Sequence, residues 1–341
     1  MRIMHVLLSR GFAGTERATA EMCNAHSAQH EVLVVLKRHQ RRHGAGIRDY
    51  LDSRVKVREV GDWWPGPALR QAVVEFRPEI VHAHLRRATR LLTRLPPPCP
   101  TVATLHLWVN GEHYLAMDGL IVIAQWQKHG LNGYRGRVFD INESLVPHRR
   151  LSGEEIQALR AELGAGPGDF LIGGVGRLAH SKGFDILIRA FQGARLPNAK
   201  LVIIGDGRAR RQLERLAGGA VHFTGFRSDV KDCYQALDLF VSPSRSEPLG
   251  RVVLEALDGG APVLATATQG PTEILSRYPG RLVPVDDPSA MRAALTELVA
   301  QRPPRLRPDL SPYYLDTVAR ETLAAYQTLA QDRVRLARSA S

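Results

Sequence analysis

Two glutamates and one glycine, spaced along a short segment, are the residues of this chain best suited to holding a polar ligand. Glu247 lies in a polar loop, and Glu255 follows inside an apolar helical pattern that begins near Gly250. Because a helix rises about 1.5 Å per residue, we expect the two carboxylates roughly 10 Å apart along one wall. That separation is too long for a shared proton, but it suits the two ends of an elongated, hydroxyl-rich ligand. Backbone amides at the helix start can receive an anion between them.

A glycine-rich segment upstream carries two cations that can bind a diphosphate. Residues 174–183 read Gly-Val-Gly-Arg-Leu-Ala-His-Ser-Lys-Gly, directly after an expected strand and before an expected helix. Glycines let the backbone approach a ligand closely, and Arg177 and Lys182 can then converge on the phosphates. The spacing is neither that of a Walker loop nor that of a dinucleotide-binding loop. Taken alone, the segment also fits a helix-entry loop with two solvated cations.

Two further glycine loops follow strands. Gly205 lies in Ile-Ile-Gly-Asp-Gly at the end of a strand, a tight turn that is common in α/β proteins. Gly11 and Gly14 lie between the first strand and a helix, a geometry that can bind an anion. An ordinary strand–helix turn explains either loop equally well.

Three histidines belong to strands of the first half. His106 ends one strand, and His82 and His84 share a face of another, because side chains alternate along a strand. A histidine in such a place is often a hydrogen-bonded structural residue. We interpret His82 and His84 as structural residues on the floor of a cleft. They could also pass for metal ligands, but the sequence places no third ligand nearby.

A basic stripe and a tryptophan pair indicate a surface for partners in the first half. Within residues 85–95, Arg86, Arg90 and Arg94 follow one helical stripe, opposite an apolar side. Such a helix can rest on anionic lipid or meet a phosphorylated acceptor, although a solvated face is the commoner outcome. The pair Trp63-Trp64, in an expected loop, can form an acceptor platform or a lid over the core.

The elements that must position these residues alternate short β-branched runs with amphipathic helices, the pattern of an α/β protein with parallel sheets. A first series of strands ends at a break near 142–147, and a second series follows. The pattern predicts two doubly wound domains in tandem, with ligands bound beyond the carboxyl ends of strands, in the cleft between the domains. Expected strands are 3–8, 32–36, 80–83, 101–105 and 119–123, then 170–174, 200–204, 221–224, 239–241 and 263–265, and expected helices are 184–191, 208–217, 230–236, 251–257 and about 314–337.

Composition fits a large protein without a membrane span. With 341 residues the chain exceeds what one compact core usually supports, and its hydrophobic fraction is 44%. No stretch approaches the ~18 apolar residues that cross a bilayer. Residues 1–8 indicate a first buried strand and not a signal peptide. Three cysteines without metal-ligand spacing indicate a reducing cytoplasm.

The net charge of +12 lies mostly in the first half of the chain, where residues 1–150 hold 22 Lys and Arg against 13 Asp and Glu, a balance of +9. Such a bias can indicate nucleic acid, an anionic membrane surface or a phosphorylated acceptor. GC-rich coding could also produce it, because Arg outnumbers Lys 40 to 6.

Taken in order, these segments resemble the retaining, GT-B-fold nucleotide-sugar glycosyltransferases of family four, also called glycosyl transferases group 1. The resemblance covers essentially the whole chain, and residues 248–253 resemble bacterial members that build lipopolysaccharide and other surface glycans. The most specific motifs are Glu247-x7-Glu255, Gly-Gly-Ala-Pro-Val at 259–263, Gln-Gly-Pro-Thr-Glu at 269–273, and Gly-Arg-x4-Lys-Gly around Arg177 and Lys182.

The resemblance implies a role for each matching position. Glu247 would hold hydroxyls of the donor hexose, and Glu255 would bind the nucleotide ribose. Arg177 and Lys182 would hold the diphosphate and stabilise its charge as it leaves, and His106 would face the donor sugar. The further substrate-binding positions would be Gly11, Gly14, Gly205, Gly250 and Arg251.

The sequence therefore predicts an α/β protein of GT-B fold, with two Rossmann-like domains facing across a cleft. Residues 1–147 would form the acceptor-side domain, to which a C-terminal helix of about 313–341 returns, and residues 148–312 the nucleotide-sugar domain. The enzyme would move a hexose from a nucleoside diphosphate sugar to a saccharide or lipid-linked acceptor. The chain lacks an Asp-x-Asp pair, so we expect no metal, and we expect no cofactor and no nucleic acid partner. The expected location is the cytoplasm, with the inner face of the cytoplasmic membrane as a contact.

Two other functions stay open at this point. One is another GT-B sugar-nucleotide enzyme, such as an epimerase or a phosphorylase, although six lysines offer few candidates for a Schiff base. The other is a non-catalytic or nucleic-acid-binding protein that uses the basic first domain, although no nucleic-acid module is recognisable. Three positions depart from the family: Ala13-Gly14 replaces Gly-Gly, Asn142-Glu143 replaces Asn-Gly, and Arg251 stands where an apolar residue is commoner.

Overall fold

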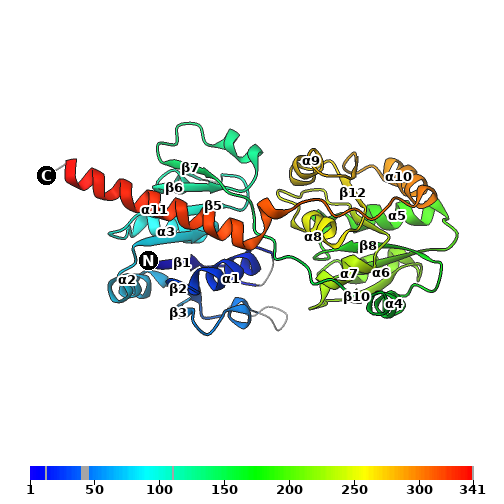
Figure 1. Cartoon of the computed structure of the whole chain (residues 1–341), viewed down its shortest axis with the longest axis horizontal. Coiled ribbons are helices and arrows are strands. Elements are labelled where there is room, and N and C mark those ends of the chain that lie inside the picture. The colour runs from blue at the N-terminus through cyan, green and yellow to red at the C-terminus, as the bar shows by residue number, and fades with distance from the viewer. Residues whose placement is uncertain (12–13, 40–45, 110, 340–341) are drawn as a thin grey trace. The chain divides into compact units, whose positions relative to one another are not determined.

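The computed structural model describes residues 1–11, 14–39, 46–109 and 111–339. They form two compact units, each built around a sheet (Figure 1). Unit 1 comprises Met1–Val146 and Ser311–Ser341, and unit 2 comprises Pro147–Leu310. Within the described ranges, every helix is too short or too polar to cross a membrane.

Unit 1 contains a seven-stranded parallel sheet in the order β3-β2-β1-β4-β5-β6-β7. The strand order reverses between β1 and β4, which makes this pair the switch point of the sheet. Their register places His5 of β1 opposite His82 of β4. The strands are β1 (Arg2–Leu7), β2 (Glu31–Lys37), β3 (Lys56–Val60), β4 (Ile80–His84), β5 (Thr101–Leu105), β6 (Gly119–Val122) and β7 (Arg137–Asp140).

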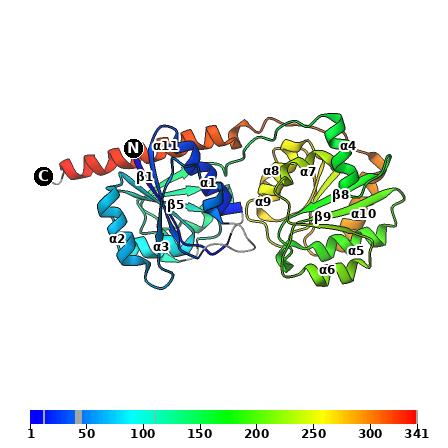
Figure 2. The same ribbon diagram turned by 90° about the horizontal axis from the view of Figure 1, so that it is seen from below.

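Helices cover both faces of the unit 1 sheet (Figure 2). Helices α1 and α11 pack together on one face. Helices α2 and α3 lie on the other, where Leu69 and Leu92 join a core with Val6 and Val35 of the strands. Because successive side chains of a strand point to opposite faces, His5 lies on the side of α1 and α11. The helices are α1 (Gly14–Ser27), α2 (Pro65–Phe76), α3 (Leu85–Arg94) and α11 (Leu315–Ser339).

Unit 2 contains a six-stranded parallel sheet in the order β10-β9-β8-β11-β12-β13. Its strand order reverses between β8 and β11, which are therefore the switch point of this sheet. The strands are β8 (Phe170–Val175), β9 (Ala199–Ile204), β10 (His222–Gly225), β11 (Leu239–Ser242), β12 (Val263–Thr266) and β13 (Arg281–Val283).

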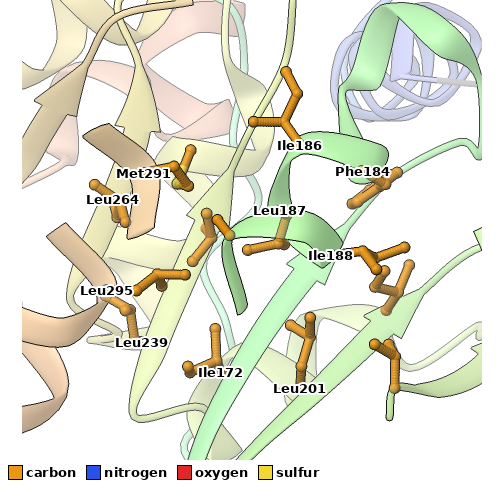
Figure 3. Close-up of a cluster of buried hydrophobic side chains, with 14 of the residues drawn as sticks. Ile172, Phe184, Ile186, Leu187, Ile188, Leu201, Leu239, Leu264, Met291 and Leu295 are labelled. Atoms are coloured by element: carbon orange, nitrogen blue, oxygen red, sulfur yellow. The ribbon is translucent and has the colours of Figure 1, made fainter. Parts of the chain in front are cut away.

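The core of unit 2 lies between its sheet and the helices α5, α6 and α10. Figure 3 shows Leu187 of α5 and Met291 and Leu295 of α10 pointing toward Ile172 and Leu239 of the strands. Each fully buried side chain of this size contributes about 1.5–3 kcal/mol to folding. The opposite face carries α4, α7 and α8 (Figure 2). The helices are α4 (Gly153–Glu162), α5 (Phe184–Ala194), α6 (Arg210–Ala217), α7 (Val230–Ala236), α8 (Arg251–Gly259), α9 (Gln269–Leu275) and α10 (Pro288–Gln301).

The predicted pair of doubly wound parallel sheets is confirmed, and the ten expected strands are all present. Strands β3, β7 and β13 were not predicted from the sequence, and they are edge strands of their sheets. Edge strands are short and carry polar side chains, so they lack the apolar run that marks a central strand. One of the two interpretations of the tryptophan pair, a lid over the core, is wrong. Trp63 and Trp64 are 88% and 84% exposed, so they form no lid over the core, and Pro65 begins α2 directly after them.

Candidate functional site

Two loops leave the sheet of unit 2 at its switch point. One follows β8 and carries Lys182 at the end of a short 3-10 turn, and the other follows β11 and carries Glu247 before α8 begins. Because β8 and β11 are neighbours, both loops start from adjacent carboxyl ends. Doubly wound sheets bind ligands at this edge, next to the switch point. Two of the residues singled out from the sequence therefore lie where this fold places ligands.

Glu247 is held between a cation and the start of a helix. Its Oε2 accepts a close hydrogen bond from Lys182 Nζ, and the two side chains are 11% and 22% exposed. Its Oε1 accepts a hydrogen bond from the amide of Gly250 at 3.3 Å. Charge-assisted bonds of this kind are strong and fix the orientation of a carboxylate. The contact joins loops that are 65 residues apart in the sequence.

Glycines allow these loops to pack backbone against backbone. Gly183 follows Lys182 at φ +65°, and a Cβ there would lie 1.9 Å from the carbonyl oxygen of Pro243. At Gly205, a Cβ would lie 2.1 Å from the carbonyl oxygen of Gly176. The glycine-rich pattern therefore has a structural cause at these two positions, because a side chain would separate the loops after β8, β9 and β11.

Glu255 lies one turn into α8, in different surroundings. It is 6% exposed, its Oε2 accepts from the hydroxyl of Tyr234 at 3.1 Å, and its Oε1 lies 3.3 Å from Arg251 Nε. Burial, together with the Glu255 charge, raises the pKa of Tyr234 well above its usual range, so the phenol stays a neutral donor. Arg251, which departs from the family pattern, is a partner of Glu255 in this structure.

The remaining sequence-predicted residues lie apart from these contacts. Arg177 is exposed in the loop after β8. Gly11 has φ +128° after β1, and Gly14 is the first residue of α1 with open space where a Cβ would stand. Ala13, the departure next to Gly14, lies outside the described residues.

His106 follows β5 in unit 1 and is almost buried, with a side chain 7% exposed. Its Nε2 lies 3.3 Å from Nδ1 of His84, and its Nδ1 lies 3.6 Å from Oε2 of Glu143. These three residues, with His82, line a small cavity of about 40 Å³. The contact of Glu143 was not predicted from the sequence, where that position stands out only as a departure from the family at the break between the domains. The strand register that brings it to His106 cannot be read from spacing alone.

A third histidine lies beside His82 and His84, which corrects the expectation that no third ligand is nearby. One ring nitrogen from each of His5, His82 and His84 lies within 4.8 Å of the others. Both nitrogens of His82 are already hydrogen-bonded, to Tyr326 Oη at 2.6 Å and to Thr104 Oγ1 at 2.8 Å. A metal ion would have to displace one of these partners, so the arrangement fits a hydrogen-bonded cluster better than a metal centre.

The basic stripe of α3 forms as predicted, but its apolar side is occupied. Arg86, Arg90 and Arg94 are exposed, whereas Ala88 and Leu92 are buried in the core of unit 1. An interfacial helix needs a free apolar face to enter a bilayer. Any contact of α3 with a membrane would therefore be made by its arginines.

Comparison with known proteins agrees with the fold. Residues 12–139 match the model of Glycosyltransferase Family 4, and residues 155–313 match that of Glycosyl transferases group 1. The lipopolysaccharide core biosynthesis glycosyltransferase LpsE of Rhizobium meliloti (strain 1021) is 34% identical over 162 residues, which are 46% of this chain and 47% of LpsE. Its counterpart LpsD, from the same organism, is 28% identical over 329 residues, which are 91% of each chain.

Among solved structures, the Anabaena protein Alr3699/HepE in complex with UDP and glucose superposes with a TM-score of 0.75. The match covers 99% of this chain and 100% of that chain at 20% identity. The two sheets and this likeness define the fold as that of the GT-B glycosyltransferases. With both halves matched by glycosyltransferase models, the chain belongs to the family-four, group 1 glycosyltransferases.

Proposed function

We propose that this protein transfers a hexose from a nucleoside diphosphate sugar to a saccharide or lipid-linked saccharide acceptor, in the biosynthesis of lipopolysaccharide or another surface glycan. The observation that carries the proposal is the Lys182–Glu247 pair at the switch point of unit 2, with the Gly250 amide on the same carboxylate. The relatives support it: LpsE and LpsD are lipopolysaccharide core glycosyltransferases, and HepE was solved with UDP and glucose.

Each residue of the donor site then has a physical task. In our proposal unit 2 is the nucleotide-sugar domain, and Glu247 accepts hydrogen bonds from hexose hydroxyls, which orients the sugar ring. Lys182 and Arg177 hold the diphosphate and stabilise the negative charge that grows on it as the glycosidic bond breaks. Glu255 accepts from the ribose hydroxyls. Lys182 can bridge the sugar-binding carboxylate and the diphosphate, because an ammonium group has three donors.

We further propose that the reaction retains the configuration of the sugar and needs no metal ion. The acceptor hydroxyl would attack on the face from which the diphosphate leaves, and a leaving-group oxygen would take its proton. No protein nucleophile is required on this route. Arg177 and Lys182 supply the positive charge that a divalent ion supplies in enzymes with an Asp-x-Asp pair, a motif that this sequence lacks.

For unit 1 we propose the acceptor side of the reaction, at the cytoplasmic face of the membrane. His106 would face the transferred sugar. The exposed arginines of α3 would contact anionic lipid, each adding about 1 kcal/mol of binding free energy near the surface.

Vesicles with and without phosphatidylglycerol test the contact. We expect binding only to the anionic vesicles, its loss at high salt, and its loss in a variant with Arg86, Arg90 and Arg94 changed to Gln. Equal binding to neutral vesicles would refute it.

Thermal unfolding with nucleoside diphosphates and their sugars tests the donor site. A ligand at 100 times its Kd stabilises the folded state by about 2.7 kcal/mol, so we expect at least one of UDP, GDP and ADP to raise the Tm by several degrees. Lys182→Gln should abolish the shift. Lys200→Gln is the matched control, because Lys200 is exposed on β9, away from the switch-point loops. If no nucleotide stabilises the protein, the donor site is wrong.

The activity assay separates the proposal from its rivals. Glu247→Ala should abolish sugar transfer while nucleotide binding persists, since the nucleotide keeps its phosphate and ribose contacts. Full activity of Glu247→Ala would contradict the role given to that carboxylate. An epimerase would convert the nucleotide sugar without an acceptor, and a nucleic-acid-binding protein would ignore nucleotide sugars altogether.

A further inference from the structure

Three histidines of unit 1 are joined end to end in a row that finishes at a carboxylate. His5 Nδ1 lies 3.0 Å from His84 Nε2, and His84 Nδ1 lies 3.3 Å from His106 Nε2. His106 Nδ1 then faces Glu143 Oε2 at 3.6 Å. The row crosses from β1 through β4 to the loop after β5, along the carboxyl edge of the sheet at its switch point. His5, His84 and Glu143 are each less than 9% exposed.

The carboxylate sets the direction of the row from one end. In its carboxylate form Glu143 can only accept, so His106 Nδ1 must carry a hydrogen, because a bare nitrogen lone pair facing the charge would be repelled. In a neutral imidazole the other nitrogen, Nε2, is then an acceptor. His84 must therefore donate from Nδ1 to His106, and by the same logic His5 must donate from Nδ1 to His84.

The other end of the row independently favours the same direction. His5 Nε2 is buried and has no hydrogen-bond partner among the described residues. In the direction set by Glu143 this nitrogen is a bare lone pair. In the reverse direction it would be a buried N–H without an acceptor, which folded proteins strongly avoid. Both ends thus favour an Nδ1–H tautomer for all three rings.

The neighbouring groups leave this assignment intact. His82 bonds to Tyr326 and Thr104 and not to the row. His26, which stacks on His5 with ring centroids 6.4 Å apart, directs its Nε2 at the carbonyl oxygen of Ala319 at 2.9 Å. Burial, reinforced by His26, lowers the pKa of His5 to about 3. Burial, reinforced by His82, His5 and His106, also lowers the pKa of His84 well below its usual range, so both rings stay neutral near pH 7.

We propose that Glu143 and His84 are positioning residues that hold His106 as a neutral imidazole with its hydrogen on Nδ1. The Nε2 lone pair of His106 accepts the hydrogen bond from His84, so a ligand can use that lone pair only by replacing His84 as the donor. A ligand can then reach His106 as a hydrogen-bond donor, such as a sugar hydroxyl, and not as an acceptor or an anion. This consequence rests on the proposed function, whereas the tautomer assignment does not.

The tautomers can be read directly in the spectrum of the full chain labelled with ¹⁵N-histidine. Correlations between ring nitrogens and ring carbon-bound protons distinguish Nδ1–H from Nε2–H in each imidazole. We expect His5, His84 and His106 to show protonated Nδ1 near pH 7 without any ligand. An Nε2–H form at any of the three would overturn the proposal. The result needs no substrate, so it stands apart from the outcome of the nucleotide-binding experiments.

Glu143→Gln tests the control that the carboxylate exerts. The Gln amide can offer either an acceptor or a donor to His106. In Glu143→Gln we therefore expect the ring-nitrogen signals of His106 to lose the pure Nδ1–H pattern, and in Glu143→Asp we expect that pattern to be kept. Thr104→Val is the matched buried control, since it removes a hydroxyl beside His82 and should leave the row unchanged.

We expect Glu143→Gln to lower kcat about tenfold or more with little change in KM for the nucleotide sugar. Unchanged tautomers in Glu143→Gln would refute the proposal, and if that variant does not fold, the wild-type spectrum still decides the direction.

Discussion

At the scale of single residues, the two buried glutamates of unit 2 differ in what surrounds them. Glu247 forms an ion pair with Lys182, a cation on a long side chain. Glu255 lies inside α8 against Tyr234 and Arg251, which comes one helical turn earlier. A carboxylate whose side-chain partner is one long lysine, with a backbone amide on its other oxygen, can exchange the lysine for a ligand hydroxyl. A carboxylate fixed by a buried phenol and a guanidinium can hold a ligand without reorganising.

Removing the Tyr234 hydroxyl should weaken unit 2 as well as the ribose contact. Tyr234 is fully buried, and its hydroxyl donates to Glu255. Tyr234→Phe leaves a buried carboxylate oxygen short of one donor, which costs about 1–3 kcal/mol in the free energy of unfolding. Urea unfolding measures the loss, and the Kd of the nucleotide should rise in the same variant. Wild-type stability in Tyr234→Phe would show that Glu255 does not depend on this bond.

A third buried carboxylate, Asp258, makes the stability of unit 2 sensitive to acid. Asp258 Oδ2 accepts two hydrogen bonds from His148, one from its backbone amide at 2.7 Å and a close one from Nδ1 of its imidazole ring. Asp258 Oδ1 lies 3.2 Å from the guanidinium of Arg150. Burial alone would raise the pKa of Asp258, but the bonds from His148 and the charges of His148 and Arg150 outweigh it and hold that pKa well below its usual range. As the pH falls, the folded protein therefore protonates Asp258 at a lower pH than the unfolded chain does.

The sign of the effect follows from that depressed pKa. The stabilisation by Asp258 is complete above the unfolded pKa of about 3.9 and is lost as the pH falls toward the folded value. Asp258→Asn should flatten the fall in unfolding free energy below about pH 4, besides lowering stability at pH 7. Urea unfolding between neutral and acid pH measures both. An acid slope that is unchanged by Asp258→Asn would assign the effect to other carboxylates.

The sequence singled out the residues of the candidate site as a prediction, but it did not predict which residues contact them. Lys182, Glu247 and Glu255 stand out because their types and spacing are unusual for a loop and a helix. Their contacts come from elsewhere: Tyr234 reaches Glu255 from α7, and Glu143 reaches His106 from beyond β7. Such pairs depend on the strand order and on the register of neighbouring strands, neither of which is encoded in local spacing.

At the scale of elements, central strands and amphipathic helices were predictable, whereas sheet edges were not. β5 (Thr101–Leu105) and α7 (Val230–Ala236) have the predicted bounds, because burial on both sides of β5 and a clear helical period in α7 leave one interpretation. β3 reads Lys-Val-Arg-Glu-Val and is half exposed, so its pattern is that of a surface segment. The loops after β8 and β11 were predicted as loops, but not the close backbone packing that glycine permits between them.

The Gly183 position provides a direct test of that packing. In Gly183→Ala the new Cβ meets the carbonyl oxygen of Pro243, and backbone atoms cannot move aside as a flexible side chain does. We expect a loss of about 1–3 kcal/mol in the unfolding free energy of unit 2 and a weaker response to nucleotide, because Lys182 is displaced from Glu247. Gly218→Ala is the matched control, since Gly218 also has a positive φ but open space around it. Equal losses in the two variants would mean that backbone conformation, and not the contact, decides the cost.

At the scale of the whole molecule, unit 1 is built from both ends of the chain. Helix α11 returns to the sheet of residues 1–146 and buries Tyr326 and Leu329 against it. The Tyr326 hydroxyl bonds to His82, and Leu329 lies where a Cβ on Gly119 would touch it. The histidine cluster is therefore covered by a helix from the far end of the sequence. The sequence shows α11 as an amphipathic stretch, but its contacts depend on the path of the Pro-rich segment before it.

Leu329→Ala should weaken unit 1 and leave unit 2 unchanged, because each unit has its own core. Deleting the buried side chain removes its packing against β6, which costs about 2–5 kcal/mol when a cavity remains. Val334→Ala, on the same helix but 51% exposed, is the matched control and should cost less than about 0.5 kcal/mol. Hydrogen exchange resolves the two units, and we expect faster exchange in β1, β4 and β6 only. Equally faster exchange in β8 and β11 would show that the units unfold as one, since loss of packing in one core then opens the other.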